Sequence, residues 1–311
     1  MKNTNKKTKK IVVLLLLIIL LTGCTKTLTK DDKPVKNPTT GQSLTENILC
    51  RPTDEETIKI YEENKDKVDI SKLPECEDFK VTSGGYEGIW TTIFVKPLAW
   101  LILTVGKFVK SYGLGLIIVS LLIRIVAYPV TRKTAMQSEL IKNAKPELDK
   151  LEKKYKDKTD QDSLMKKNQE MMMIYNKYNI NPISGCLFSF IQLPLFIGFL
   201  EAINRVPAIF EEKFLVFQLG TTPTTAFSNG NYLYLILIVI VAVTTYFSFK
   251  LNATAMPDKS QAKTMNTTMV IMITVMGLFM TSALNIYWIT TNVFTIVQNL
   301  LVKRGNKNGK I

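Results

Sequence analysis

Histidine is absent from this 311-residue chain, and its four cysteines form no Cys-x-x-Cys pair. Imidazole and thiolate groups are the usual protein ligands of zinc, and histidine is the usual base of a nucleophilic triad. The sequence also has no phosphate-binding Gly-x-x-x-x-Gly-Lys-[Ser/Thr] loop. We therefore expect no metal, no cofactor and no enzyme activity.

Charged and hydrophobic residues are separated along the chain. The formal net charge is +14, yet 46% of the residues are hydrophobic and the mean hydropathy is positive, +0.11. These values occur together in membrane proteins that have basic loops. The basic charge therefore indicates membrane topology rather than nucleic-acid binding, and we expect no DNA partner.

The N-terminus has the pattern of a targeting segment. Five lysines among the first ten residues precede an unbroken apolar run, Ile11–Leu21. A membrane span needs about 20 residues, so this shorter run suits the core of a signal peptide. The run ends in Leu-Thr-Gly-Cys, which resembles a bacterial lipobox. We interpret residues 1–23 as a signal peptide and Cys24 as a lipidated residue that carries palmitate, in preference to an uncleaved anchor with an incidental cysteine.

Residues 24–88 are polar, and a lipidated Cys24 would place them outside the cell. The part up to about Leu44 is predicted to be a flexible tether, and the stretch DEETIKIYEENKDKV a short helix. Cys50 and Cys76 both lie in this segment. Spacing alone does not fix their pairing, so a disulfide and two free thiols are equally good interpretations.

Five apolar stretches are long enough, or nearly so, to span a membrane. They are Gly113–Val130, Ile183–Ala202, Tyr232–Phe249, Met265–Ala283 and Leu284–Val302. A sixth stretch, within residues 89–110, is interrupted by Lys96, Pro97 and Lys107 and contains two tryptophans. This composition favours an amphipathic helix that lies in the membrane interface.

The charge of the loops predicts the orientation in the membrane. Between Arg132 and Pro182 there are twelve Lys or Arg residues against eight Asp or Glu, which the positive-inside rule places in the cytoplasm. A lipidated N-terminus outside and a first span at Gly113–Val130 give this orientation and also place the basic tail, residues 305–311, in the cytoplasm. A spanning helix at residues 89–110 would reverse it, which again favours the interfacial interpretation.

The cytoplasmic loop, residues 132–182, has helical periodicity. Apolar side chains recur at three- and four-residue steps from about Thr131 to Tyr155, and again from Leu164 to Tyr178. Two amphipathic helices joined by the polar turn KDKTDQD predict an antiparallel helical hairpin. Pro146 is expected to kink or break the first of them.

Arg124 lies inside the first predicted span. At 1.5 Å per residue it sits about 16 Å into a hydrocarbon core about 30 Å thick, where a charged side chain is unfavourable. The interiors of the five spans contain no Asp or Glu, and Glu201 stands only at the far end of the second. We therefore expect Arg124 to face water, with its negative partner supplied by a visiting molecule.

Polar residues at helical spacing extend this prediction to three of the five spans. Ser120, Arg124 and Tyr128 share one face of the first, and Ser189 and Gln192 share a face of the second; the last has a stripe of Trp288, Thr291, Asn292, Thr295, Gln298 and Asn299. Such side chains often join membrane helices through hydrogen bonds, the commoner role for any one of them. Together with the arginine, they favour a hydrated cavity.

A hydrated, positively charged cavity fits more than one class of protein. A secondary transporter usually has repeats, broken helices and, for proton coupling, intramembrane acids, which the sequence does not clearly show. The sequence does not exclude a channel whose pore is formed by oligomerisation. A small-anion transporter or channel is thus the alternative function, whereas an inert lipoprotein scaffold leaves Arg124 unexplained.

Three stretches carry a more specific pattern. They are YGLGLIIVSLLIRIVAYPVTRKTAMQSELIKNAKPELDKLEKKY, MMMIYNKYNINPISGCLFSFIQLPLFIGFLEAI and NIYWITTNVFTIVQNLLVKR. In order and spacing they resemble the YidC family of membrane protein insertases, in the lipoprotein-anchored form of Gram-positive-type bacteria. The similarity covers about Ile89 to Arg304. Two positions depart from the family pattern: Phe188 replaces a proline, and Ser282-Ala283-Leu284 replaces the Pro-Ala-Gly turn between the last two spans.

The resemblance implies an all-α membrane protein whose five spans surround a hydrophilic groove, open to the cytoplasm and to lipid and closed outside. Arg124 matches the groove arginine of the family, Trp288 the nearby aromatic residue and Gln192 the glutamine of the second span. The implied function is insertion and folding of nascent membrane proteins without nucleotide hydrolysis, with the hairpin helping to receive substrates. The Sec translocation channel and the ribosome are further partners to consider; contact of the basic tail with ribosomal RNA is an alternative to a purely topological role.

Overall fold

A computed structural model describes residues 25–158, 160–181, 184–251 and 259–307, and the side chains among them outside 184–191, 259–262 and 306–307. The predicted signal peptide and the lipidation site, Cys24, lie outside the described residues. The chain divides into two compact units. The first comprises residues up to Val119 together with Pro194–Tyr234 and Phe279–Tyr287, and the second comprises Ser120–Leu193, Leu235–Leu278 and the residues from Trp288 onward.

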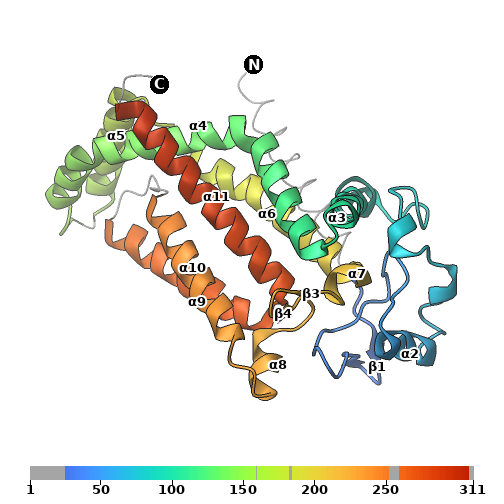
Figure 1. Cartoon of the computed structure of the whole chain (residues 1–311). Coiled ribbons are helices and arrows are strands. Elements are labelled where there is room, and N and C mark those ends of the chain that lie inside the picture. The colour runs from blue at the N-terminus through green and yellow to red at the C-terminus, as the bar shows by residue number, and fades with distance from the viewer. Residues whose placement is uncertain (1–24, 159, 182–183, 252–258, 308–311) are drawn as a thin grey trace. The chain divides into compact units, whose positions relative to one another are not determined.

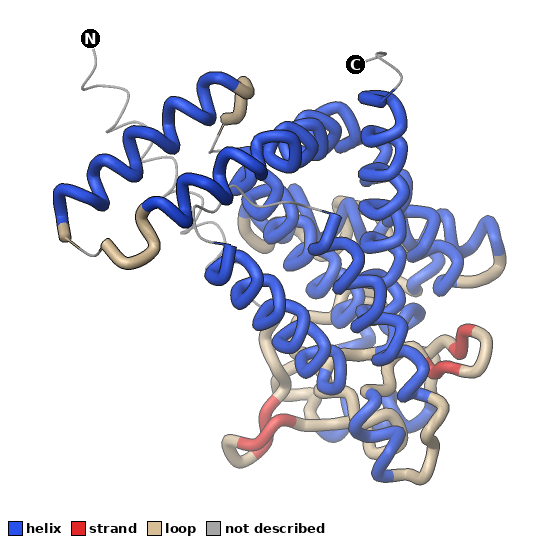
Figure 2. Tube along the Cα trace, turned by 90° about the vertical axis from the view of Figure 1, so that its left-hand side faces the viewer, coloured by secondary structure: helices blue, strands red, loops and turns tan. Residues whose placement is uncertain are grey.

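The described chain is mostly helical, which confirms the predicted all-α class (Figures 1 and 2). The longer helices are α3 (Lys96–Val109), α4 (Tyr112–Lys154), α5 (Gln161–Lys177), α6 (Ser184–Arg205), α9 (Tyr234–Leu251), α10 (Lys259–Phe279) and α11 (Ser282–Lys307). The short ones are α2 (Glu55–Glu63), α7 (Pro207–Phe210) and α8 (Pro223–Ser228), and a π-helical turn, Thr91–Val95, precedes α3. The strands form two hairpins, β1 (Thr29–Lys30) with β2 (Lys33–Pro34) and β3 (Lys213–Phe214) with β4 (Phe217–Gln218).

Three helical segments in the described part of the chain are long and apolar enough to cross a membrane: Thr91–Val109, Tyr112–Lys154 and Tyr234–Leu251. A shorter apolar helix covers Lys263–Phe279. Two of the long segments contain predicted spans. The segment Thr91–Val109 has the length and composition of a span although its sequence led us to expect an interfacial helix, so the five-span arrangement stays a prediction.

The segment that follows the N-terminus is folded, and the prediction of a flexible tether is wrong. Leu28 and Leu44 are isolated among polar residues in the sequence, but they meet in one core, and the amide of Leu28 donates to the carbonyl of Leu44 at 2.8 Å. The predicted helix is present as α2, where Asp54 accepts a hydrogen bond from the amide of Thr57. A disulfide joins Cys50 and Cys76, whose Cα atoms are 4.8 Å apart. The structure therefore shows a disulfide where the spacing of the two cysteines in the sequence allowed either a disulfide or free thiols.

Helix α4 is continuous for 43 residues and contains both Pro129 and Pro146. The sequence had suggested separate span and loop helices, with a kink or a break at Pro146. There is no break, because a proline removes only one backbone donor and the helical bonds on both sides persist. In the second unit, the C-terminal part of α4 packs along α5 through a core that includes Ile141, Ala144 and Tyr175, which forms the helical hairpin.

The connection between α10 and α11 is tight although the sequence there departs from the family pattern. Helix α10 ends at Phe279 and α11 begins at Ser282. The amide and the hydroxyl of Ser282 both donate to the carbonyl oxygen of Thr221, at 2.9 and 2.8 Å. The carbonyl of Thr221 thus satisfies the amide of the first residue of α11 and holds the start of this helix without a Pro-Ala-Gly turn.

Two glycines allow α3 and α4 to approach closely. A Cβ atom added to Gly115 would lie 2.7 Å from the amide nitrogen and 2.8 Å from the Cα atom of Gly106. It would also lie 2.9 Å from the carbonyl oxygen of Ile102. Because all of these atoms belong to backbone, they cannot move aside as a side chain would. Small residues at helix contacts of this kind are common in membrane proteins.

Replacing Gly115 by leucine is therefore expected to lower the free energy of unfolding by about 1 to 3 kcal/mol, as overpacked cores do. The thermal unfolding temperature of the purified protein in detergent, followed by intrinsic fluorescence, measures this change. Leu114→Ala is the control, because the Leu114 side chain is substantially exposed and its truncation should change little. An unfolding temperature of Gly115→Leu equal to that of the parent would contradict the close helix contact.

Candidate functional site

Arg124 is held in the second unit by a residue of α6. Its Nη2 atom donates a hydrogen bond to Oε1 of Gln192 at 2.5 Å, so the structure brings together the two residues that the sequence placed on different spans. Arg124 is 6% exposed, and protein covers most of its surface. Gln192 thus supplies an acceptor from within the protein, and the expectation that Arg124 faces water stays a prediction.

The acceptor that Gln192 offers to Arg124 is an amide oxygen. A glutamine side chain accepts a hydrogen bond through its oxygen but carries no charge. The Arg124–Gln192 pair therefore keeps a net charge of +1. Ser120, one helical turn before Arg124, is also buried, whereas Tyr128, one turn after it, is partly exposed. These residues form the polar face of α4.

The polar stripe of α11 joins it to two other helices of the second unit. The Nδ2 atom of Asn292 donates to the hydroxyl of Thr245 on α9 at 2.9 Å. The Nε2 atom of Gln298 donates to the hydroxyl of Thr131 on α4 at 3.0 Å. Both residues therefore form hydrogen bonds between helices, the commoner role for a polar side chain in a membrane helix.

The other predicted residues of the stripe have different surroundings. The hydroxyl of Thr295 donates within α11, to the carbonyl oxygen of Thr291 at 2.8 Å, and Nδ2 of Asn299 donates in the same way to Thr295. Trp288 is partly exposed on this helix. The side chain of Ser189 lies outside the described set. Some residues of the stripe thus form hydrogen bonds to other helices, and others form them within α11.

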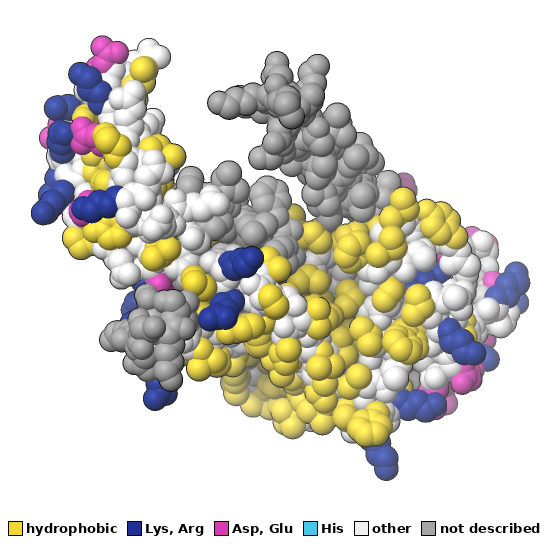
Figure 3. Space-filling model, turned by 90° about the horizontal axis from the view of Figure 1, so that it is seen from above, with side chains coloured by type: hydrophobic (Ala, Val, Ile, Leu, Met, Phe, Trp, Pro, Cys, Tyr) yellow, Lys and Arg dark blue, Asp and Glu magenta, His cyan; other side chains and the backbone are white. Residues whose placement is uncertain are grey.

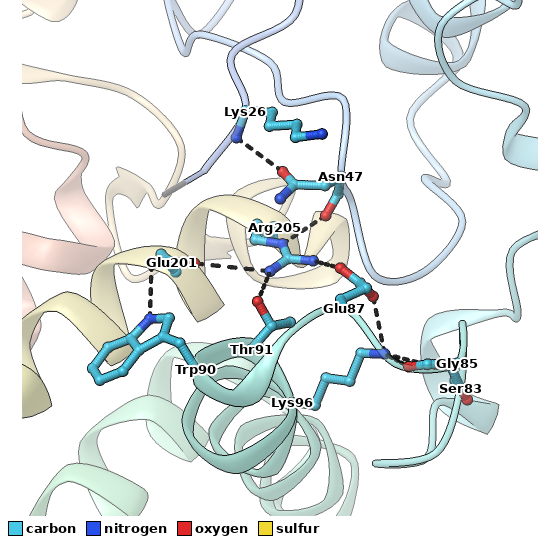
Figure 4. A network of polar contacts seen from close by, with 10 residues as sticks. All are labelled: Lys26, Asn47, Ser83, Gly85, Glu87, Trp90, Thr91, Lys96, Glu201 and Arg205. Atoms are coloured by element: carbon cyan, nitrogen blue, oxygen red, sulfur yellow. Dashed lines mark hydrogen bonds and ion pairs between the residues drawn. The ribbon is translucent and has the colours of Figure 1, made fainter. Parts of the chain in front are cut away.

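A cluster of buried charges in the first unit was missed by the sequence analysis (Figure 4). Arg205, which is fully buried, lies with its Nη2 atom 2.5 Å from Oε2 of Glu87 and its Nη1 atom 3.8 Å from Oε2 of Glu201. The other oxygen of Glu87 lies 2.9 Å from Nζ of Lys96, whose side chain is also fully buried. The indole nitrogen of Trp90 donates to Glu201 at 2.9 Å.

The cluster connects the polar N-terminal segment to the apolar helices α3 and α6. Nε of Arg205 donates to the carbonyl oxygen of Asn47 at 2.6 Å, and Lys96 donates to the carbonyls of Ser83 and Gly85 at 2.7 and 2.6 Å. In the sequence, Lys96 stands out only as an interruption of an apolar stretch. The available signal was the pairing of Glu201 with Arg205 at a four-residue step, the spacing of helical ion pairs.

A cavity of about 820 Å³ lies elsewhere in the first unit. Its lining includes five carboxylates, two lysines and Tyr112; the carboxylates are Glu75, Glu77, Asp78, Glu211 and Glu212, and the lysines are Lys107 and Lys110. Burial raises the pKa of Glu211, although its carboxylate accepts hydrogen bonds from both the amide and the hydroxyl of Thr53. These bonds hold the polar segment to the loop after α7, which gives the residues a structural role.

The helical hairpin presents charge and hydrophobic side chains together. Figure 3 shows Lys and Arg side chains, with acidic ones between them, along the outer edge of the hairpin at the left. Ion pairs cross between its two helices, Lys154–Glu170 at 2.6 Å and Lys177–Glu147 at 2.5 Å, and the bonds from Lys177 and Tyr178 lower the pKa of Glu147. Several apolar side chains of α5 remain exposed, among them Leu164, Met165, Met172 and Met173. Methionine side chains adapt to surfaces of different shape.

Long apolar helices together with a buried arginine on a polar helix face are the features of an α-helical membrane protein. A family model described as "60Kd inner membrane protein" matches residues 104–309. The chain belongs to the YidC family of membrane protein insertases.

Several curated relatives support this assignment. A protein of Oceanobacillus iheyensis named membrane protein insertase YidC is 37% identical over 219 residues, which cover 70% of this chain and 85% of that protein. The membrane protein insertase MisCA of Bacillus subtilis is also 37% identical, with 69% and 79% covered. A Listeria monocytogenes protein named membrane protein insertase YidC 1 is 35% identical over 223 residues, 71% of this chain and 74% of its own length.

A solved structure shares the fold. It is titled "Active YidC insertase crystal structure with the first transmembrane domain resolved" and matches with a TM-score of 0.51 over 78% of this chain. The sequence identity is 23%, so the likeness concerns the fold. This chain spans about half, 52%, of the length of that one.

The buried charge cluster is expected to be critical for stability. Arg205→Ala leaves Glu87 and Glu201 without their guanidinium partner, and breaking a buried ion pair on one side lowers the free energy of unfolding by about 3 to 5 kcal/mol. Thermal unfolding in detergent measures the effect. Lys107→Ala removes an ion pair to Glu77 whose two side chains are largely exposed and should leave the unfolding temperature nearly unchanged. Equal unfolding temperatures for both variants would show that the cluster contributes no more than a surface pair.

Proposed function

We propose that this protein inserts newly made membrane proteins into the bacterial cell membrane and helps them fold. Membership of the YidC family and the names of the curated relatives support the proposal. The observation that carries it is the Arg124–Gln192 pair, a positive charge held by a neutral partner on the polar face of an otherwise apolar helix.

The physical difficulty of insertion is the passage of a polar tail through hydrocarbon. Each backbone group that loses its hydrogen bonds there raises the free energy by several kcal/mol. In our proposal the five spans enclose a hydrated groove, open to the cytoplasm and to lipid and closed on the outer side, that shortens this path. Arg124, Gln192, Trp288 and the other polar residues of the three helices line it; the others are Ser120, Tyr128, Asn292 and Thr295.

Arg124 would attract an acidic residue of the arriving tail. In a region of reduced dielectric this attraction is stronger than in water, and it offsets part of the loss of hydration of both charges. A neutral hydrogen-bond partner suits this role, because the amide of Gln192 orients the guanidinium without cancelling its charge. The interaction remains weak enough for the tail to be released.

The apolar helix of the client then moves from the groove into lipid. Its transfer is favourable by about 25 cal/mol for each Å² of apolar surface removed from water, so insertion proceeds without nucleotide hydrolysis or covalent chemistry. The hairpin receives the client in the cytoplasm through its basic surface and the exposed apolar side chains of α5. The Sec channel and the ribosome are additional partners in this proposal.

The same proposal fixes the orientation in the membrane. The lipidated Cys24 anchors the N-terminus outside the cell, followed by the disulfide-bonded polar segment, and the hairpin and the C-terminal tail lie in the cytoplasm. The charge of residues 132–182 supports this orientation through the positive-inside rule.

Insertion is tested with a client that has one span and a short acidic tail, added to liposomes with and without the purified protein. We expect a protease-protected client fragment only in the liposomes that contain the protein. Liposomes with protein that protect no more than empty ones would contradict intrinsic insertase activity. Saturable uptake of a small anion by the same vesicles would instead favour a transporter or channel.

The charge of Arg124 is tested in the same assay. Arg124→Ala should reduce insertion of the acidic-tail client by about tenfold, since a hydrogen bond to a charged group contributes about 1.5 to 3 kcal/mol. Arg124→Lys should retain much of the activity, because it keeps the positive charge.

Lys133→Ala is the matched control, because it removes an exposed cation from the same helix. It should insert the client as the parent does. Equal losses in Arg124→Ala and Arg124→Lys would argue against a simple charge role and for the hydrogen-bond geometry of the guanidinium.

A further inference from the structure

A two-residue turn in the first unit presents hydrophobic side chains to the outside. Strands β3 and β4 pair with Phe214 opposite Phe217, so that Leu215 and Val216 alone form the loop of the hairpin. Leu215 is 77% exposed and Val216 is 51% exposed. Apolar residues at such a tip gain nothing from the interior of the protein, which raises the question of what they contact.

The backbone of this loop does not favour leucine. Leu215 has a φ of +55°, in the left-handed region. Two-residue hairpin loops with positive φ at their first position favour glycine or asparagine there, since a side chain is unfavourable in this conformation. Leu215 therefore places a large apolar side chain at the tip although its backbone conformation is unfavourable for a residue with a side chain.

The hairpin is fixed at the beginning of α4. Glu212, which precedes β3, accepts hydrogen bonds from the hydroxyl of Ser111 at 2.7 Å and from the amide of Tyr112. A Cβ atom added to Gly113 would lie 2.5 Å from the ring of Phe214, which shows how closely this ring packs on the helix. The base of the hairpin thus lies against the first turn of α4.

The other strand is fixed at the beginning of α9. The amide of Gln218 donates to the hydroxyl of Tyr234 at 2.8 Å. The rings of Phe217 and Tyr234 meet edge to face with their centroids 5.3 Å apart. Tyr112 and Tyr234 are the first residues of two helices that are long and apolar enough to cross a membrane. The hairpin therefore contacts the first residues of both helices.

The surroundings of the hairpin have the composition of a membrane interface. Tyrosines at positions 112, 232 and 234 stand at the two helix ends, and Tyr232 is 68% exposed. Leu114 and Leu233 beside them are also exposed, at 42% and 50%. Tyrosine is enriched where membrane proteins pass between water and hydrocarbon. Exposed leucines next to it continue the lipid-facing surface of the helices.

We infer that the β3–β4 hairpin is an interfacial anchor whose tip, Leu215 and Val216, inserts between phospholipids of the leaflet at the N-terminal ends of α4 and α9. The partner is the lipid itself, since the tip is continuous with the lipid-facing starts of two apolar helices. Insertion would bury both side chains and so compensate for the unfavourable φ of Leu215. It would also fix the height of α4, the helix that carries Arg124, relative to the bilayer.

The depth of the tip is measured with the full-length protein in phosphatidylcholine vesicles. Leu215→Trp and, separately, Val216→Trp add a fluorophore at the tip, and the signal of the parent, with its three tryptophans, is subtracted. Bromine on the lipid acyl chains quenches a tryptophan in the bilayer, whereas iodide quenches one in water. Glu62→Trp, on the exposed face of α2 in the polar segment, is the water-exposed control.

We expect brominated lipid to reduce the added fluorescence of at least one tip variant at least twofold more than that of Glu62→Trp, with weak quenching by iodide. Iodide quenching of both tip variants as strong as that of Glu62→Trp would overturn the inference. Protection from both quenchers would also overturn it, because a protein surface and not lipid would then cover the tip. Two positions are used so that misfolding of one variant leaves the other to decide.

Discussion

The hydrogen bond from Arg124 to Gln192 meets the strictest constraint on this chain, that a charge within an apolar helix needs partners. In hydrocarbon no solvent satisfies a guanidinium, so an acceptor from the protein stabilises it there. Helix α6 does so with a neutral amide. The polar faces of the neighbouring helices follow the same rule: Asn292 bonds to Thr245 and Gln298 to Thr131, so helices that carry polar groups are joined through them.

The first unit satisfies its buried charges differently. Arg205 and Lys96, both without exposed side-chain surface, share the carboxylate of Glu87. Removing charges from water is unfavourable, and close opposite charges with additional carbonyl acceptors make it tolerable. The consequence is a firm attachment of the polar segment to the apolar helices. In contrast, the Arg124–Gln192 pair keeps a net positive charge, because the amide of Gln192 is neutral. Our proposed function needs this charge to attract an acidic residue of the client.

Several features followed from local sequence alone. The period of apolar residues predicted the hairpin of α4 and α5, and the pattern around Asp54 predicted α2, because helical periodicity and capping depend on neighbours within a few residues. The prediction of a flexible tether was wrong because it considered only neighbouring residues. Leu28 and Leu44 form a core only when residues distant in sequence meet. The disulfide between Cys50 and Cys76 likewise depended on distance in space, which spacing in the sequence does not give.

The sequence by itself determined the helical membrane class, the family and the identity of the candidate residues, since hydropathy, periodicity and motif order are properties of the linear chain. Only the tertiary structure decided which of those residues act together. It paired Arg124 with Gln192, 68 positions apart, and it assigned Asn292 and Gln298 to contacts between helices. It also revealed the ion pair of Arg205 with Glu87, 118 positions away, because such a pair requires a distance of a few ångström that no pattern along the chain specifies.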